Sequence, residues 1–160
     1  MVLVPLLAAA VAGVAAWTDL RWRRIPNWLT LGTAILGLAV NVALAGGPGA
    51  LTALLGLGLG LALLLPFYVL RAVGAGDVKL LAALGAVLGP QALVSVALYG
   101  AVVGGVMSAV ILLGRGRLML TLNELVVQRT LPSLSGATAP YAVAIASGVY
   151  LSMLLPAVGA

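Results

Sequence analysis

The chain has 160 residues, of which 64% are hydrophobic and only 7% are charged, and its mean hydropathy is +1.27. Soluble domains are closer to half apolar and a quarter charged, so this composition excludes an ordinary water-soluble domain and indicates a membrane protein. Histidine and cysteine are both absent, which excludes disulfides, thiol nucleophiles, serine–histidine triads and zinc sites built from either residue.

Six apolar segments follow one another along the chain. They cover approximately residues 2–18, 28–45, 50–70, 77–88, 91–113 and 140–155. The second segment stops at the turn cluster Gly46–Gly49, and the fourth stops before Gly89-Pro90. Because the apolar runs are continuous, without the period-two alternation of a barrel strand, we expect α-helices. The sequence therefore predicts one all-α domain over residues 1–160, a polytopic membrane protein with six transmembrane helices.

The basic residues predict how these helices are oriented. The net charge is +5, and every basic residue lies beside the end of an apolar segment. They fall after the first segment, around the link between the third and fourth, and between the fifth and sixth: Arg21, Arg23, Arg24, Arg71, Lys79, Arg115, Arg117 and Arg129. By the positive-inside rule these three links are cytoplasmic, so both termini are non-cytoplasmic. The predicted location is the inner (cytoplasmic) membrane, with the lipid bilayer as partner and no nucleic-acid binding.

Small residues recur at four-residue spacing in several of the segments. They are Ala8, Ala12 and Ala16 in the first, Gly56 and Gly60 in the third, and Gly100 and Gly104 in the fifth. Faces of this kind let membrane helices approach closely, so we expect helix contacts there. A general bias toward alanine and glycine is the alternative explanation.

Acidic residues are the strongest indication of chemistry in this chain. There are three, Asp19, Asp77 and Glu124, and the predicted topology places the two aspartates at the same membrane edge. A carboxylate at membrane depth is costly and indicates function by default. Two carboxyl groups that share a proton and a water can perform aspartyl proteolysis, one acting as base and the other as acid. Glu124 lies in the long link 114–139. It is interpreted as a solvated polar residue, and contact with a basic leader peptide is the alternative.

Two glycines precede the second aspartate, in the order Gly74-Ala75-Gly76-Asp77. Glycine permits unusual backbone dihedrals and close approach of another chain, so Gly74 and Gly76 are predicted to support the active-site backbone. The motif is common wherever glycine is frequent. It gains weight here because it begins one membrane helix while a second aspartate ends another.

Two segments resemble one protein family when they are read together. The segment Asp19-x-Arg21-x-Arg23-Arg24-Ile25-Pro26-Asn27 follows the first helix, and Gly74-x-Gly76-Asp77-Val78-Lys79-Leu80 begins the fourth. Together they resemble the type IV prepilin peptidases, which are GxGD-type membrane aspartyl proteases. The resemblance extends to the six-helix layout and to residues 140–145 at the start of the last helix. It implies that Asp19 and Asp77 are the catalytic pair.

The chain departs from larger members of that family in two respects. Only a short link separates the first two helices, and no cysteine pairs are present. The chain therefore resembles the short form associated with tight-adherence (Flp) pili, which lacks the methyltransferase domain. Ala142 also stands where the family pattern leads us to expect glycine, which weakens the assignment of roles to Pro140 and Tyr141.

Five further residues are candidates for substrate binding: Pro26, Asn27, Lys79, Pro140 and Tyr141. Each also has a purely structural interpretation. Pro26 and Asn27 suit the start of a helix. Lys79 lies about 200° around a helix from Asp77, so we expect its ammonium to reach lipid headgroups rather than to pair with that aspartate.

The predicted function is that of a membrane aspartyl endopeptidase. It would cut the short basic leader from prepilin or pseudopilin substrates, which also carry a hydrophobic helix, at the cytoplasmic membrane face. We expect no cofactor and no metal, while the oligomeric state stays open. The alternatives are a small proton-coupled transporter and a non-catalytic subunit of pilus assembly or secretion.

Overall fold

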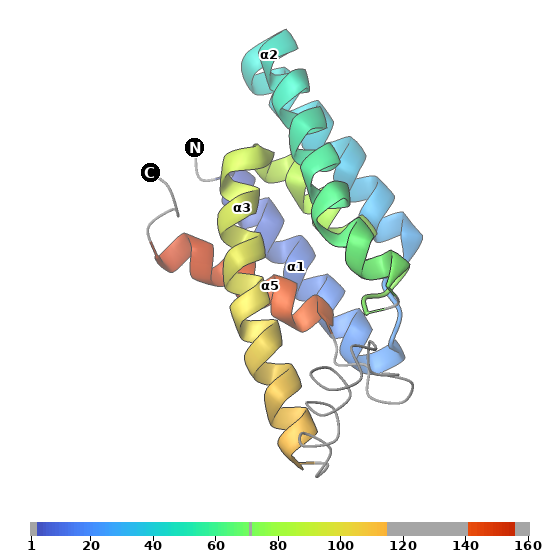
Figure 1. Ribbon diagram of the computed structural model, residues 1–160. Helices are drawn as coiled ribbons and strands as arrows, with labels where there is room; N and C mark the ends of the chain where they lie inside the picture. The colour runs from blue at the N-terminus through green and yellow to red at the C-terminus, as the bar shows by residue number, and fades with distance from the viewer. Residues whose placement is uncertain (1–2, 71, 115–140, 156–160) are drawn as a thin grey trace.

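The computed structural model describes residues 3–70, 72–114 and 141–155, and within these ranges the regular structure is entirely helical. The helices are α1 (Leu3–Trp22), α2 (Asn27–Val69), α3 (Ala75–Gly114) and α5 (Tyr141–Leu154), shown in Figure 1. Three of these four, all but α5, are long and apolar enough to cross a membrane. The predicted all-α membrane class is thus confirmed for the described residues. Pro140, Arg71 and Glu124 lie outside them.

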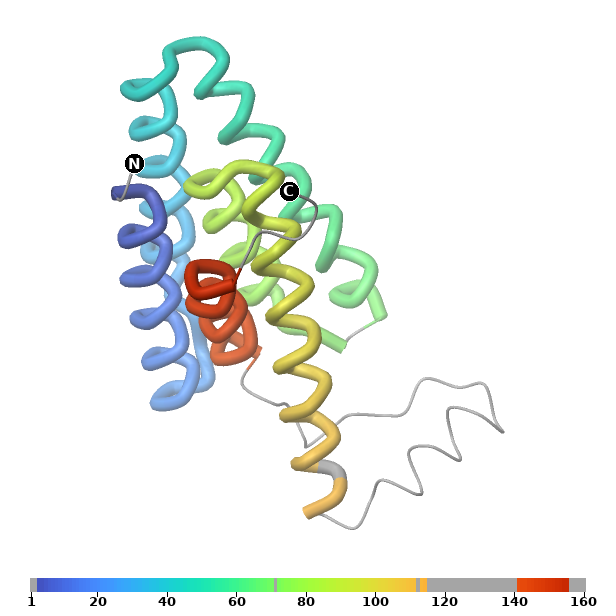
Figure 2. The backbone as a smooth tube through the Cα atoms, turned by 90° about the vertical axis from the view of Figure 1, so that its left-hand side faces the viewer, coloured from blue at the N-terminus to red at the C-terminus, as the bar shows by residue number. Residues whose placement is uncertain are grey.

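Both long helices fold back on themselves at a glycine. Backbone dihedrals are non-helical at Gly46 (φ 60°, ψ −134°) in α2 and at Gly89 (φ 78°, ψ 171°) in α3. Figure 2 shows that each helix reverses there, so that its two halves run antiparallel. Positive φ is accessible to glycine without the Cβ penalty of other residues, which explains why the chain turns at the two glycines that the sequence indicated.

Two helix boundaries differ from the prediction. Helix α1 was predicted to end near residue 18 but continues to Trp22, so that Asp19 lies in its last turn. Neither glycine nor proline interrupts that turn, and the helix ends only at Arg23, whose φ is 52°. The start of α3 moves in the other direction, to Ala75, which places Asp77 in the first turn.

Glycines bring the second half of α2 into direct backbone contact with the first half of α3. A Cβ added to Gly56 would collide with the carbonyl group of Gly85, and one added to Gly60 would lie 2.7 Å from the Cα of Ala82. Between α3 and α5, a Cβ on Gly100 would lie 3.2 Å from the Ala144 carbonyl oxygen. The prediction that these small residues form helix contacts is confirmed.

An asparagine links the first half of α2 to the turn in α3. The Asn41 amide nitrogen donates to the carbonyl oxygens of Gly37 at 2.9 Å, Ala86 at 3.0 Å and Val87 at 3.1 Å. Pro90 has no N–H, so the carbonyl of Ala86 lacks the donor that an uninterrupted helix would supply four residues later. The Asn41 side chain provides this donor.

Helix α1 packs mainly on α5 and touches α2 and α3 much less. Its buried side includes Ala8, Ala12 and Ala15, and the Tyr150 hydroxyl of α5 donates to the Ala9 carbonyl oxygen at 3.1 Å. The end of α1, the start of α2, the end of α2 and the start of α3 all lie at one end of the bundle (Figures 1 and 2). This arrangement brings the two predicted aspartates to the same end.

Candidate active site

The first turn of α3 holds Asp77 through reciprocal bonds with Gly74. The Gly74 N–H donates to Oδ2 of Asp77 at 3.2 Å, and the Asp77 N–H donates to the Gly74 carbonyl oxygen at 3.1 Å. This is the backward half of a capping box, in which a side chain of the first turn bonds the N–H that precedes the helix. A Cβ on Gly74 would lie 3.2 Å from the same Oδ2, so glycine leaves room for the carboxylate.

Asp19, in the last turn of α1, is held by the start of α5. The backbone N–H of Ala142 donates to its carboxylate, and Arg23 lies near enough to act on its charge. Its Oδ2 atom is buried and has no hydrogen-bond partner among the described residues. A buried carboxylate oxygen that lacks a donor is unusual and calls for a role, such as holding a proton or a water.

These two aspartates lie at the same end of the bundle although 57 residues separate them in the chain. They are near enough for the charge of Asp19 to act on Asp77, and the Tyr141 phenol lies within the electrostatic range of Asp77. The start of α5 therefore bonds Asp19 through the Ala142 backbone and carries Tyr141 within the electrostatic range of Asp77. In general, two carboxyl groups that come together can hold one proton between them and direct both groups at one water.

The link between α1 and α2 lies against the start of α3 through two contacts. A Cβ on Gly76 would lie 3.2 Å from the Cβ of Ile25, and the Lys79 ammonium donates to Oδ1 of Asn27 at 3.0 Å. The sequence did not predict this contact between Lys79 and Asn27, while the reach of the Lys79 ammonium to lipid headgroups stays a prediction. Pro26 immediately precedes α2 with extended dihedrals (φ −64°, ψ 136°) and starts the helix, as its sequence position indicated.

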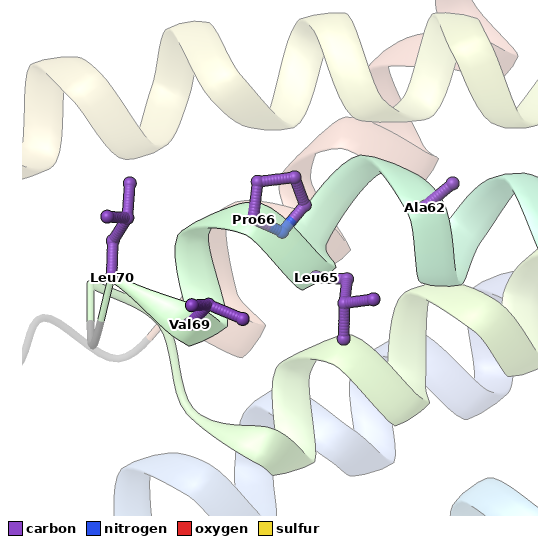
Figure 3. A pocket seen from close by; sticks show the side chains of 5 residues that line it. All are labelled: Ala62, Leu65, Pro66, Val69 and Leu70. Atoms are coloured by element: carbon purple, nitrogen blue, oxygen red, sulfur yellow. The ribbon is translucent and has the colours of Figure 1, made fainter.

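An apolar pocket of about 560 Å³ lies along the last turns of α2. It is open to the outside and is lined by Ala62, Leu65, Pro66, Val69 and Leu70 (Figure 3). These residues immediately precede the connection to the first turn of α3. This pocket was not predictable from the sequence, because the same apolar residues are expected on any lipid-facing helix.

Metal ligands do not gather in the part of the chain that the structure describes. No three His, Cys, Asp or Glu side chains there come together. The two aspartates are the described acidic groups from which a site could be built, and two carboxylates alone are a poor ligand set for zinc.

Comparison with known protein families gives a match. The model of the type IV leader peptidase family matches residues 6–109, a range that includes both aspartates and more than half of the chain. No curated protein and no solved structure matches. The chain therefore belongs to the type IV leader peptidase family and is a prepilin peptidase, a membrane protease of the aspartic type.

Proposed function

We propose that Asp19 and Asp77 are the catalytic pair of this peptidase. One ionised carboxylate removes a proton from the shared water, and the water oxygen attacks the scissile carbonyl carbon. The other, protonated acid donates a hydrogen bond to the carbonyl oxygen as negative charge develops on it. When the C–N bond breaks, a carboxyl proton passes to the departing amine, which leaves the pair with one proton and one charge.

The convergence of the end of α1 with the start of α3 is the observation that carries this proposal. The charge of Asp19 acts on Asp77, and Oδ2 of Asp19 has no donor among the described residues. Both acids lie in the terminal turns of their helices rather than mid-helix. A proton-coupled transporter would be expected to place its carboxylates near the bilayer midplane, so this placement favours the protease.

The substrates would be prepilins or pseudopilins that carry a short basic leader before a hydrophobic helix. We place the cut at the cytoplasmic face, because the arginine-bearing link after α1 adjoins the site and basic links are retained on that side. Counting each half of α2 and α3 as one span gives six spans with α1 and α5, and both termini are then non-cytoplasmic. The chain is a single-domain, multi-pass protein of the inner membrane in this topology.

Tyr141 is the described residue best placed to contact substrate beside the pair. It begins α5, and the charge of Asp77 acts on its phenol. A phenol there can donate a hydrogen bond to a substrate carbonyl or to the developing oxyanion.

Co-expression with a prepilin tests the proposal. Asp19→Asn and Asp77→Asn keep the side-chain shape but cannot exchange the proton, so each variant should leave the prepilin uncut while inserting normally into the membrane. Thr52→Val is a matched control, because Thr52 lies beyond the turn at Gly46 and its hydroxyl bonds only the local Pro48 carbonyl. Full processing by either Asp variant would overturn the assignment.

A further inference from the structure

We propose that Asn27 and Lys79 form a positioning pair that fixes the distance between the two aspartates. The inference rests on the proposed function, since it assumes that Asp19 and Asp77 are catalytic. It assigns Asn27 and Lys79 to the alignment of the site instead of to substrate binding. The pair would act by holding the link between α1 and α2 against the first turns of α3.

The contact itself joins residues that are 52 positions apart. The Lys79 ammonium donates to Oδ1 of Asn27 at 3.0 Å. Asn27 is the first residue of α2, while Lys79 lies two residues beyond Asp77 in α3. A hydrogen bond with a charged donor is stronger than one between neutral groups, so this contact suits a fastening between two helix starts.

A second contact lies beside the first and has the same effect. The Ile25 side chain packs against Gly76, where an added Cβ would come within 3.2 Å of the Ile25 Cβ. Ile25 and Asn27 flank Pro26, and Gly76 and Lys79 flank Asp77 along the chain. The link is therefore fastened to α3 on both sides of the catalytic aspartate, by packing on one side and by a charged hydrogen bond on the other.

The position of Asp19 relative to Asp77 depends on how the end of α1 is held. Helix α1 packs mainly on α5 and has much less contact with α2 and α3. Asp19 is held from the α5 side by the Ala142 N–H. On the other side, a link of only four residues, 23–26, joins α1 to Asn27. Because so short a link transmits displacement of its end, releasing Asn27 from Lys79 would allow the end of α1 to move relative to α3.

A mutant cycle on prepilin cleavage separates positioning from substrate contact. Misplacement of reacting groups by about 1 Å can cost on the order of a hundredfold in rate, so Asn27→Leu and Lys79→Met should each lower kcat by about tenfold or more. KM should change less than twofold, and the double variant should be no slower than the worse single variant. Asn27→Asp keeps the acceptor oxygen and should retain most of kcat, whereas an asparagine that donated to substrate would lose it.

Covalent cross-linking provides a second test of the positioning role. Because the chain has no native cysteine, a thiol reagent would modify only the introduced cysteines. Asn27→Cys/Lys79→Cys should be slow when reduced and should recover kcat when a short bifunctional thiol reagent bridges the two sulfurs. The same protein treated with a monofunctional reagent of similar size is the matched control and should stay slow. A bridge restores position but cannot restore two lost substrate contacts.

The outcomes distinguish this inference from the proposed function. Losses that multiply in the double variant, a rise in KM at constant kcat, or a bridge that leaves kcat low would overturn the positioning role. None of these results would disturb the aspartyl assignment, which falls only if Asp19→Asn or Asp77→Asn cleaves prepilin. Adding Asp19→Asn to the bridged protein should abolish the recovered activity.

Discussion

Replacing Gly56 by alanine should destabilise the protein, whereas the same change at Gly58 should not. Both glycines lie in the second half of α2, two residues apart. A Cβ on Gly56 would meet the backbone carbonyl of Gly85, a group that cannot rotate away, while a Cβ on Gly58 would have nothing within 4 Å. The pair therefore isolates the cost of separating α2 from α3.

The expected magnitudes follow from two opposing effects. Alanine is favoured over glycine within a helix by about 1 kcal/mol, and this gain applies at both positions. Overpacking a close contact costs about 1–3 kcal/mol, and the upper end applies where the obstacle is backbone. Gly56→Ala should thus lower the free energy of unfolding by about 2 kcal/mol after the helix gain is subtracted, whereas Gly58→Ala should raise it by up to about 1 kcal/mol.

Reversible unfolding in mixed micelles measures both changes, and prepilin cleavage adds a functional test. Displacement of Gly85 shifts the first half of α3, the element that begins with the Asp77 turn. Gly56→Ala should therefore also cleave more slowly than Gly58→Ala under conditions in which both are folded. Equal unfolding free energies for the two variants would refute the close backbone packing of α2 on α3.

Three other predictions concern the turn in α3, the Asp77 turn and the topology. Asn41→Leu removes the donor to two α3 carbonyl groups and should lower the free energy of unfolding by about 1–3 kcal/mol; an unchanged unfolding curve would contradict it. Gly74→Ala places a Cβ 3.2 Å from Oδ2 of Asp77 and should reduce kcat with unchanged insertion, whereas wild-type kcat would show that the carboxylate has free space. Reporter fusions at Arg23 should report the cytoplasm and those at Gly47 the outside; the reverse pattern would invert the proposed topology.

Much of the fold follows from the sequence because membrane helices are local structures. Continuous apolar runs predicted the helical class, and Gly46 and Gly89 marked the reversals correctly because only glycine adopts their positive φ readily. The predicted end of α1 was four residues too early, because no helix-breaking residue directly follows Asp19. The predicted start of α3 was two residues too late, because Ala75 can begin a helix. The α1–α5 pairing was not predictable, because similar alanine and glycine faces occur on several segments.

The site was predictable in its residues but less so in its contacts. The two aspartates stood out as rare acids beside the ends of apolar segments. The Lys79–Asn27 bond was missed because reasoning about a single helix places Lys79 only relative to Asp77, whereas its partner begins another helix. Asn41 could have been found by its sequence context, as an amide inside an apolar run that needs a partner. The backbone N–H of Ala142, which donates to Asp19, could not have been found in this way, since backbone groups are the same at every position.

The most direct test of the central claim is the kcat/KM for prepilin cleavage by purified Asp19→Asn, Asp77→Asn and the double variant. Residues that act as one catalytic unit are strongly non-additive, because removing one already abolishes the contribution of the other. We predict that each single variant loses about a thousandfold or more in kcat/KM and that the double variant is no worse than either. A single variant that retains activity within tenfold of wild type, or losses that multiply in the double variant, would contradict a shared Asp19–Asp77 centre.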